Sequence, residues 1–190
     1  MTTQSVQPTP QTAPQVEPWL RGTYSDLPAV LRAILHAFDL AREDAVHWAD
    51  GLTEAELHSS PSGLSPICFH LRHIARSLDR MLTYAEGNQL SPEQLTAART
   101  ELDPGVSREE LLAEFHQGLD RAAQRVRAFA SADLEEPRSV GKKQLPTSVG
   151  GLLVHLADHT QRHTGQIVTT AKLLKAARVE VAPAGVHGLS

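Results

Sequence analysis

The sequence is poor in several residue types that would otherwise define its class. Of 190 residues one is cysteine and 4% are aromatic, and no apolar run approaches the roughly 18 residues that a membrane-spanning helix needs. The single cysteine, Cys68, excludes an intrachain disulfide and a metal or redox site of the CxxC type. We therefore expect a chain that folds without covalent cross-links, which suits the reducing cytoplasm.

Charge and known motifs exclude further classes of function. The formal net charge is -4, so the chain has no general attraction for nucleic acid or for anionic lipid. The N-terminal residues lack the basic start and apolar core of a secretory signal. The HExxH, GxGxxG and GxxxxGK[ST] patterns are absent, which leaves zincin, Rossmann and P-loop functions without support. We expect a cytoplasmic protein without nucleic-acid or membrane partners.

The two ends of the chain differ in composition from its centre. Residues 1–18 are rich in Gln, Thr and Pro and carry no charge before Glu17, so they cannot bury enough apolar surface to offset their ordering entropy. We predict a disordered arm over residues 1–18, one domain over residues 19–177, and a loose tail over residues 178–190, which contains Pro183.

Four long stretches of the chain carry apolar residues at alternating spacings of three and four. This spacing is typical of a helix with one buried face. Capping residues and breakers set the expected ends of each helix. The expected helices run from near Ser25 or Asp26 to Gly51, from Ile67 to Ala85, from Ser107 to Phe129, and from near Thr147 or Ser148 to Ala177.

A shorter helix is expected between the second and third long helices. There, Ser91-Pro92-Glu93-Gln94 is a capping box with proline at the first helical position. Residues 132–146 are expected to form a loop with a small hairpin around Gly141. Because each apolar stripe must be buried against the others, the pattern predicts an all-α four-helix bundle with one short extra helix between helices 2 and 3.

Histidine is the one residue type that is abundant and unevenly placed. Five of the ten histidines fall in two windows, one in the second long helix and one in the last. His159 and His163 lie four apart within the apolar stripe of the last helix, and residues at this spacing share one helix face. Two such imidazoles can face a common ion, but a third ligand must come from another helix. On the residues alone, a metal site and packed core histidines are equally supported.

Two histidines of the second helix compete for the place of the third ligand. Relative to the apolar stripe of that helix, His70 lies about 70° off centre and His73 about 130° off centre, so the angle favours His70. Phe69, Ser77 and Tyr84 lie on the same side as His73, however, and would widen the buried face.

Two strings of the sequence resemble the signatures of the DinB/YfiT-like superfamily. They are HLADHTQRHTGQI at residues 155–167 and HIARSLD at residues 73–79. The resemblance covers roughly residues 19–176. It implies a four-helix bundle that binds a divalent metal, usually described as nickel or zinc. The metal is held by one histidine of the second helix and an HxxxH pair of the last.

Carried over residue by residue, the resemblance implies the metal ligands His73, His159 and His163. His70 is retained as a substitute ligand or as a group that supports one. Further candidates for lining the site or orienting a ligand are His155, Gln166, Asp79 and Tyr84.

The resemblance also indicates a class of function. Three neutral imidazoles leave a bound ion its full charge and at least one open position. Similar proteins include transferases and isomerases that use low-molecular-weight thiols, and others are described as metal-dependent hydrolases. We therefore expect a thiol S-transferase acting on a small molecule, with a hydrolase and a non-catalytic metal-binding or stress-response bundle as alternatives. The remaining hypothesis is a structural bundle that binds no metal. The sequence leaves open whether the protein forms a homodimer.

Overall fold

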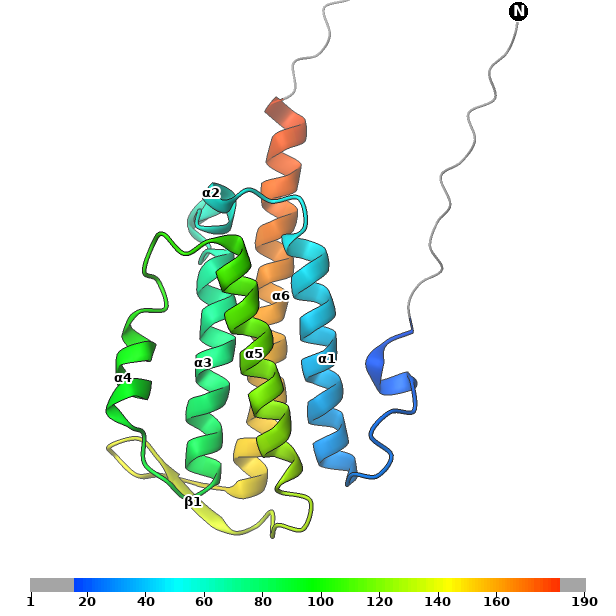
Figure 1. Ribbon diagram of the computed structural model, residues 1–190, viewed down its shortest axis with the longest axis vertical. Helices are drawn as coiled ribbons and strands as arrows, with labels where there is room; N and C mark the ends of the chain where they lie inside the picture. The colour runs from blue at the N-terminus through cyan, green and yellow to red at the C-terminus, as the bar shows by residue number, and fades with distance from the viewer. Residues whose placement is uncertain (1–15, 182–190) are drawn as a thin grey trace, which may run out of the picture.

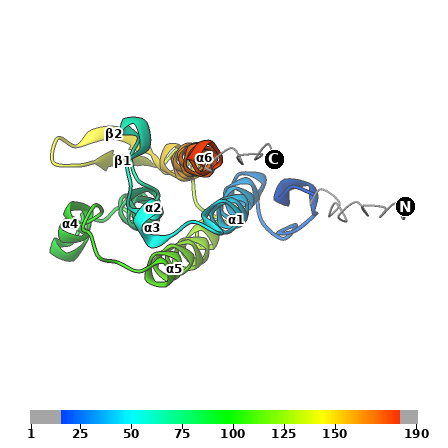
Figure 2. The same ribbon diagram turned by 90° about the horizontal axis from the view of Figure 1, so that it is seen from above.

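The computed structural model describes residues 16–181 and shows four long helices packed side by side (Figure 1). Helices α1 and α6 run in one direction, and α3 and α5 run in the other. Both α1 and α3 pack against α5 and α6, so the four helices form a ring when seen from above (Figure 2). The expected four-helix bundle is confirmed. The long helices are α1 (Ala29–Ala49), α3 (Ile67–Ala85), α5 (Arg108–Arg127) and α6 (Val149–Val181).

Short elements fill the connections between the long helices. A hairpin joins α5 to α6, and its antiparallel register places Pro137 opposite Ser148 and Val140 opposite Leu145. This hairpin and α4 were both predicted, whereas α2 was not. The short elements are the 3-10 turns η1 (Pro18–Leu20) and η2 (Pro61–Gly63), the helices α2 (Glu54–Leu57) and α4 (Pro92–Arg99), and the strands β1 (Pro137–Val140) and β2 (Leu145–Ser148).

The parallel course of α3 and α5 explains the position of α4. Because neighbouring parallel helices need a crossover connection, residues 86–107 must return along the length of the bundle, and α4 lies within that return. Three arginines spaced four apart on α3 hold the connection against the bundle. Arg72 donates to the Asp103 carbonyl at 3.0 Å, Arg76 to the Ala97 carbonyl at 2.6 Å, and Arg80 to the Glu101 carboxylate at 2.9 Å.

The start of α1 differs from the prediction. The helix begins at Ala29 rather than near Ser25 or Asp26, and Pro28 takes the cap position with an extended ψ of 149°. A proline disfavours helical geometry in the residue before it, so Leu27 stays outside the helix.

The end of α6 also differs from the prediction. The helix continues to Val181, so residues 178–181 extend the helix that was expected to end at Ala177. The first strong helix breaker in this part of the sequence is Pro183. Residues 1–15 of the predicted arm and 182–190 of the predicted tail lie outside the described residues.

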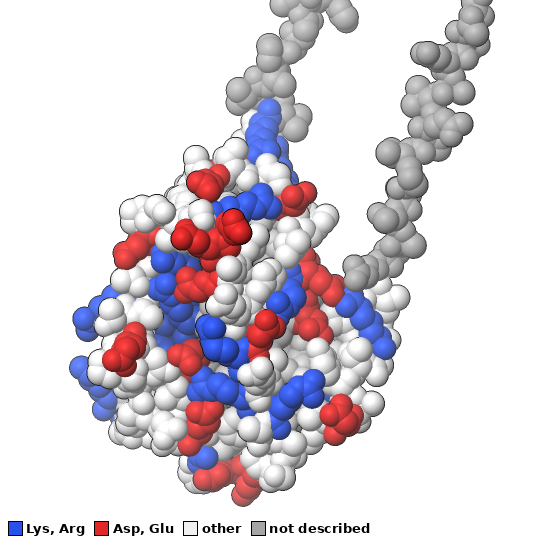
Figure 3. Space-filling view, viewed as in Figure 1, with Lys and Arg blue, Asp and Glu red and all other residues white. Residues whose placement is uncertain are grey.

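The charged side chains of the surface show no separation by sign on the face seen in Figure 3. On the face seen in Figure 3, basic and acidic side chains are intermingled, so this face shows no extended basic patch. Within residues 16–181, no helix combines the length and the apolar character that a membrane span requires.

The bundle core is mostly aliphatic, and α3 and α5 approach each other closely at one glycine. A Cβ atom on Gly118 of α5 would lie 2.6 Å from the Cβ and 2.9 Å from the Cα of Ala75 on α3. Only a hydrogen fits at this position without a shift of the backbone, so Gly118 fixes the spacing of the two helices.

We expect Gly118→Ala to lower the free energy of unfolding by about 1–2 kcal/mol, because overpacking against Ala75 outweighs the better helix propensity of alanine. Gly165→Ala in α6 is the matched control. A Cβ there meets nothing within 4 Å, so this variant should be as stable as the wild type or more stable. Urea unfolding measures both variants, and a Gly118→Ala protein at least as stable as the wild type would contradict the packing.

Candidate metal centre

Three imidazoles from two helices meet at one point of the bundle. His73 comes from α3, and His159 and His163 come from consecutive turns of α6. One nitrogen from each ring lies within 4.8 Å of the others. The ring centroids are 4.4 Å apart for His73 and His163, 4.5 Å for His159 and His163, and 5.0 Å for His73 and His159. These are the three residues that the family resemblance selected.

Glu101 orients the ring of His73. Its Oε2 lies 2.7 Å from His73 Nδ1, its Oε1 accepts from Arg80 at 2.9 Å, and the residue is 6% exposed. Burial acts to raise the pKa of Glu101, but the hydrogen bonds from His73 and Arg80 outweigh it and hold the pKa below its ordinary value. An ionised carboxylate only accepts hydrogen bonds, so Nδ1 of His73 is the donor, and in the neutral ring this leaves the Nε2 lone pair free.

Ser77 orients the ring of His159 in the same way, by accepting a hydrogen bond from Nδ1. Its hydroxyl donates to the Ile74 carbonyl at 3.1 Å, so its oxygen is left to accept from His159 Nδ1 at 3.4 Å. The free Nε2 of His159 then faces Nε2 of His73 at 3.2 Å. Two lone pairs at this distance repel each other unless a proton or a cation lies between them. The donor chemistry of the pair therefore fits a bound cation.

His163 is paired through its Nδ1 with His70. The two Nδ1 atoms lie 3.0 Å apart, and His70 is 1% exposed. One ring of the pair must donate and the other accept. Donation by His163 leaves its Nε2 lone pair free, as in His73 and His159. In that arrangement all three clustered rings have Nδ1 engaged and Nε2 available.

Burial keeps His70, His159 and His163 neutral. Burial lowers the pKa of His70, His159 and His163 to about 4 each, and repulsion between the neighbouring imidazoles acts in the same direction. Near neutral pH these rings are therefore unprotonated, which is the form that binds a metal. Phe69 stacks on His73 with a centroid distance of 5.1 Å and covers part of the cluster with an apolar surface.

Two of the remaining candidates lie beside the cluster. The ring of His155 is 5.3 Å from that of His159, and its Nδ1 is 3.8 Å from the Asp158 carboxylate. Gln166 is exposed and lines a hollow of about 280 Å³ together with His70. His155 thus neighbours one of the three imidazoles, and Gln166 neighbours His70.

Two other candidates lie elsewhere. The Asp79 carboxylate accepts from Arg125 at 2.6 Å and from Gln94 at 2.7 Å, so the structure gives it partners other than an imidazole. Tyr84 is buried near the other end of α3 and lines a separate hollow beside Arg138. Tyr84 and Gln166 therefore line different hollows.

The carboxylate that does orient an imidazole, Glu101, was missed from the sequence. It lies 28 residues after His73, in the crossover that follows α4. No local pattern marks it. The one available signal is the row of arginines on α3, which indicates that acidic or carbonyl groups must lie against that face.

The fold and the site together define a four-helix bundle with a three-histidine cluster between two antiparallel helices. The sequence model of the DinB superfamily matches residues 37–167, which include all three histidines, and the chain belongs to that superfamily. Among solved structures, a conserved protein from Enterococcus faecalis is similar, with 20% identity and a TM-score of 0.56 over 77% of this chain and 98% of that one. This likeness shows the shared fold. No curated protein matches the chain.

We expect the metal-free protein to lose stability as the pH falls from about 6.5, the pKa of an unperturbed histidine, towards the folded values of about 4. In this window the unfolded chain binds more protons than the folded protein, so acidification favours unfolding. Urea unfolding in the presence of a chelator, between about pH 7 and 5, measures the slope. His70→Gln should flatten it, and a wild-type stability that is constant or rises on acidification would contradict this account.

Proposed function

We propose that this protein binds one divalent transition metal, nickel or zinc, through the Nε2 atoms of His73, His159 and His163. The observation that supports this most directly is the orientation of the rings. Each clustered imidazole has its Nδ1 beside a second residue, and such outer partners are the usual way in which metal-binding histidines are fixed.

The donor set suits these metals. Neutral imidazole is a good ligand for zinc and nickel, and no carboxylate belongs to the set, so a bound ion would keep its full positive charge. Three protein ligands also leave room for a small molecule to bind. A non-catalytic metal-binding bundle would share the ligands but would not need an open position for a small molecule.

We further propose that the site transfers a low-molecular-weight thiol to an electrophilic small molecule. The metal, when bound, would lower the pKa of a thiol in the open position and polarise the electrophile. In the reaction, sulfur would bond to the electrophilic carbon, the leaving group would depart with its bonding pair, and the thiol proton would pass to solvent. Cells keep such thiols reduced in the cytoplasm, where we place the protein.

The state of Glu101 favours thiol transfer over hydrolysis. Within residues 16–181, it is the one carboxylate that is hydrogen-bonded to any of the three imidazoles, and both of its oxygens are already engaged, by His73 and Arg80. It therefore holds the proton on His73 Nδ1 and is poorly placed to act as a general base toward water. Hydrolysis is the second candidate function, since a metal site of this kind also lowers the pKa of water.

We expect tag-free wild-type protein to contain about one nickel or zinc ion per chain, and His159→Ala to contain essentially none, by plasma mass spectrometry. His155→Ala is the matched control, because it removes an imidazole one turn away on the same helix and should retain the metal. Glu101→Gln should keep the fold and lower the metal affinity about 10- to 100-fold in competition with a chelator.

Two results would contradict the metal proposal. One is a wild type that takes up no metal after incubation with nickel and zinc. The other is an equal loss of metal from His155→Ala and His159→Ala, which would mean that the three-histidine set is not the site.

The thiol proposal is tested separately on metal-loaded protein. We expect consumption of 1-chloro-2,4-dinitrobenzene to require both a small thiol and the protein, and to fall to the uncatalysed rate in His159→Ala. If metal-loaded protein shows no thiol-dependent rate with a panel of thiols and electrophiles but hydrolyses activated esters, hydrolysis replaces thiol transfer. If it shows neither rate, the non-catalytic function is favoured.

A further inference from the structure

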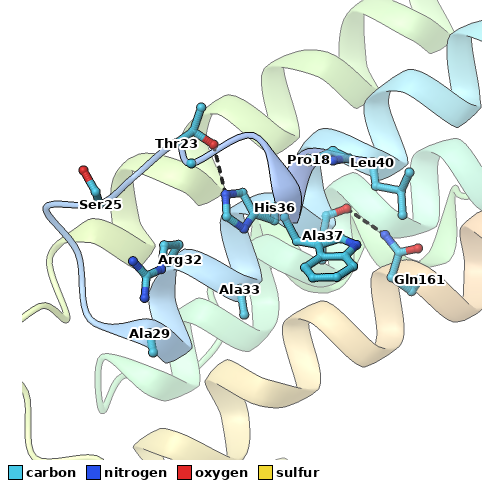
Figure 4. A pocket seen from close by; sticks show the side chains of 12 residues that line it. Pro18, Thr23, Ser25, Ala29, Arg32, Ala33, His36, Ala37, Leu40 and Gln161 are labelled. Carbon is cyan, nitrogen blue, oxygen red and sulfur yellow. Dashed lines mark hydrogen bonds between the residues drawn. The ribbon is translucent and has the colours of Figure 1, made fainter. Parts of the chain in front are cut away.

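A second pocket lies on the other side of α6 from the three histidines, between α1 and the segment that precedes it (Figure 4). Its volume is about 530 Å³, within the usual range for small-molecule sites. Gln161 of α6 lies at one end of this pocket. Because Gln161 is two residues from both His159 and His163, it points about 200° away from them around the helix.

One end of the pocket is apolar. Pro18 of the N-terminal segment and Leu40 of α1 lie there, as Figure 4 shows, and Trp19, the next residue after Pro18, also lines the pocket. Trp19 is 61% exposed, and its indole N–H donates to Glu17 at 2.7 Å, so within residues 16–181 a large part of its aromatic ring is left uncovered. Gln161 donates its side-chain N–H to the Ala37 carbonyl at 2.7 Å, and its Oε1 has no hydrogen-bond partner among residues 16–181.

The opposite end is cationic. Arg32 lies there with Ala29 and Ser25, as Figure 4 shows. Within the described part of the chain, the Arg32 guanidinium makes no hydrogen bond or ion pair, whereas nearby Arg21 is paired with Glu43 at 2.5 Å. No acidic residue lines the pocket. In a protein with a net charge of -4, an arginine left without an acid in a concave site is not explained by a surplus of basic residues.

The middle of the pocket and the start of α1 favour the same kind of ligand. His36 is 7% exposed, and its Nε2 lies 2.9 Å from the Thr23 hydroxyl, while its Nδ1 has no hydrogen-bond partner among residues 16–181. Helix α1 begins at Ala29 with no side-chain cap and no acidic residue in its first turn. Its free N–H groups add to the positive potential at the Arg32 end.

We propose that this pocket binds a small organic carboxylate with an aromatic or branched apolar body. The carboxylate pairs with Arg32, whose planar guanidinium matches a carboxylate in a two-point hydrogen-bonded contact. The body lies towards Pro18, Trp19 and Leu40, where it covers exposed apolar surface. This site is separate from the metal centre and does not depend on the function proposed for it.

Calorimetric titration of the full-length protein with 2-naphthoate tests the proposal, with the neutral 2-naphthamide as the matched ligand. Chelator-treated protein excludes binding to a metal. We expect the amide to bind at least about tenfold more weakly than the acid, and Arg32→Gln to weaken naphthoate binding by a similar factor, because a charged hydrogen-bonded contact is lost. Arg99→Gln, on distant α4, should bind naphthoate like the wild type.

A second variant locates the ligand independently of charge. Ala33 lines the pocket and is exposed, so Ala33→Trp should fill the space without disturbing the core and should abolish binding. His159→Ala should bind naphthoate normally. The proposal is overturned if the wild type does not bind naphthoate, if the acid and the amide bind equally, or if Ala33→Trp, folded by circular dichroism, binds as the wild type does.

Discussion

The antiparallel packing of α3 against α6 is the contact on which the rest of the structure depends. It places one turn of α3 opposite two turns of α6, so that His73 meets His159 and His163. Burying imidazoles with free lone pairs costs free energy. The aliphatic residues of the same two helices, such as Ile74 and Leu156, are fully buried and hold the helices together despite that cost. The cluster is thus maintained by the hydrophobic core around it.

A second consequence follows from the order of the helices in the ring. Because α3 and α5 are parallel neighbours, the chain must cross back along the bundle between them, and the arginines of α3 bind this crossover. The crossover in turn delivers Glu101 to His73. A connection that the topology requires therefore also supplies the carboxylate that orients the ring of a proposed metal ligand.

Features with local causes could be predicted from the sequence. The bounds of α3, the capping boxes of α4 and α5 and the hairpin follow from spacing, caps and turn residues within a few positions. Thr53 and Glu56 form a similar box that would have indicated α2.

Features that depend on tertiary packing were harder to predict from the sequence. The angular argument favoured His70, which is indeed the more buried residue, at 1% exposure, whereas the side chain of His73 is 18% exposed. The degree of burial thus does not identify a ligand. Glu101 reaches His73 only through the crossover, so the sequence near His73 could not have indicated it.

The most direct test of the three-histidine centre is anomalous diffraction from crystals of the protein at the nickel and zinc absorption edges. The account predicts one peak, at bonding distance from the Nε2 atoms of His73, His159 and His163, with Glu101 still bound to His73 Nδ1. A peak bound instead by His70 or His155, or the absence of any peak from crystals soaked in both metals, would contradict it.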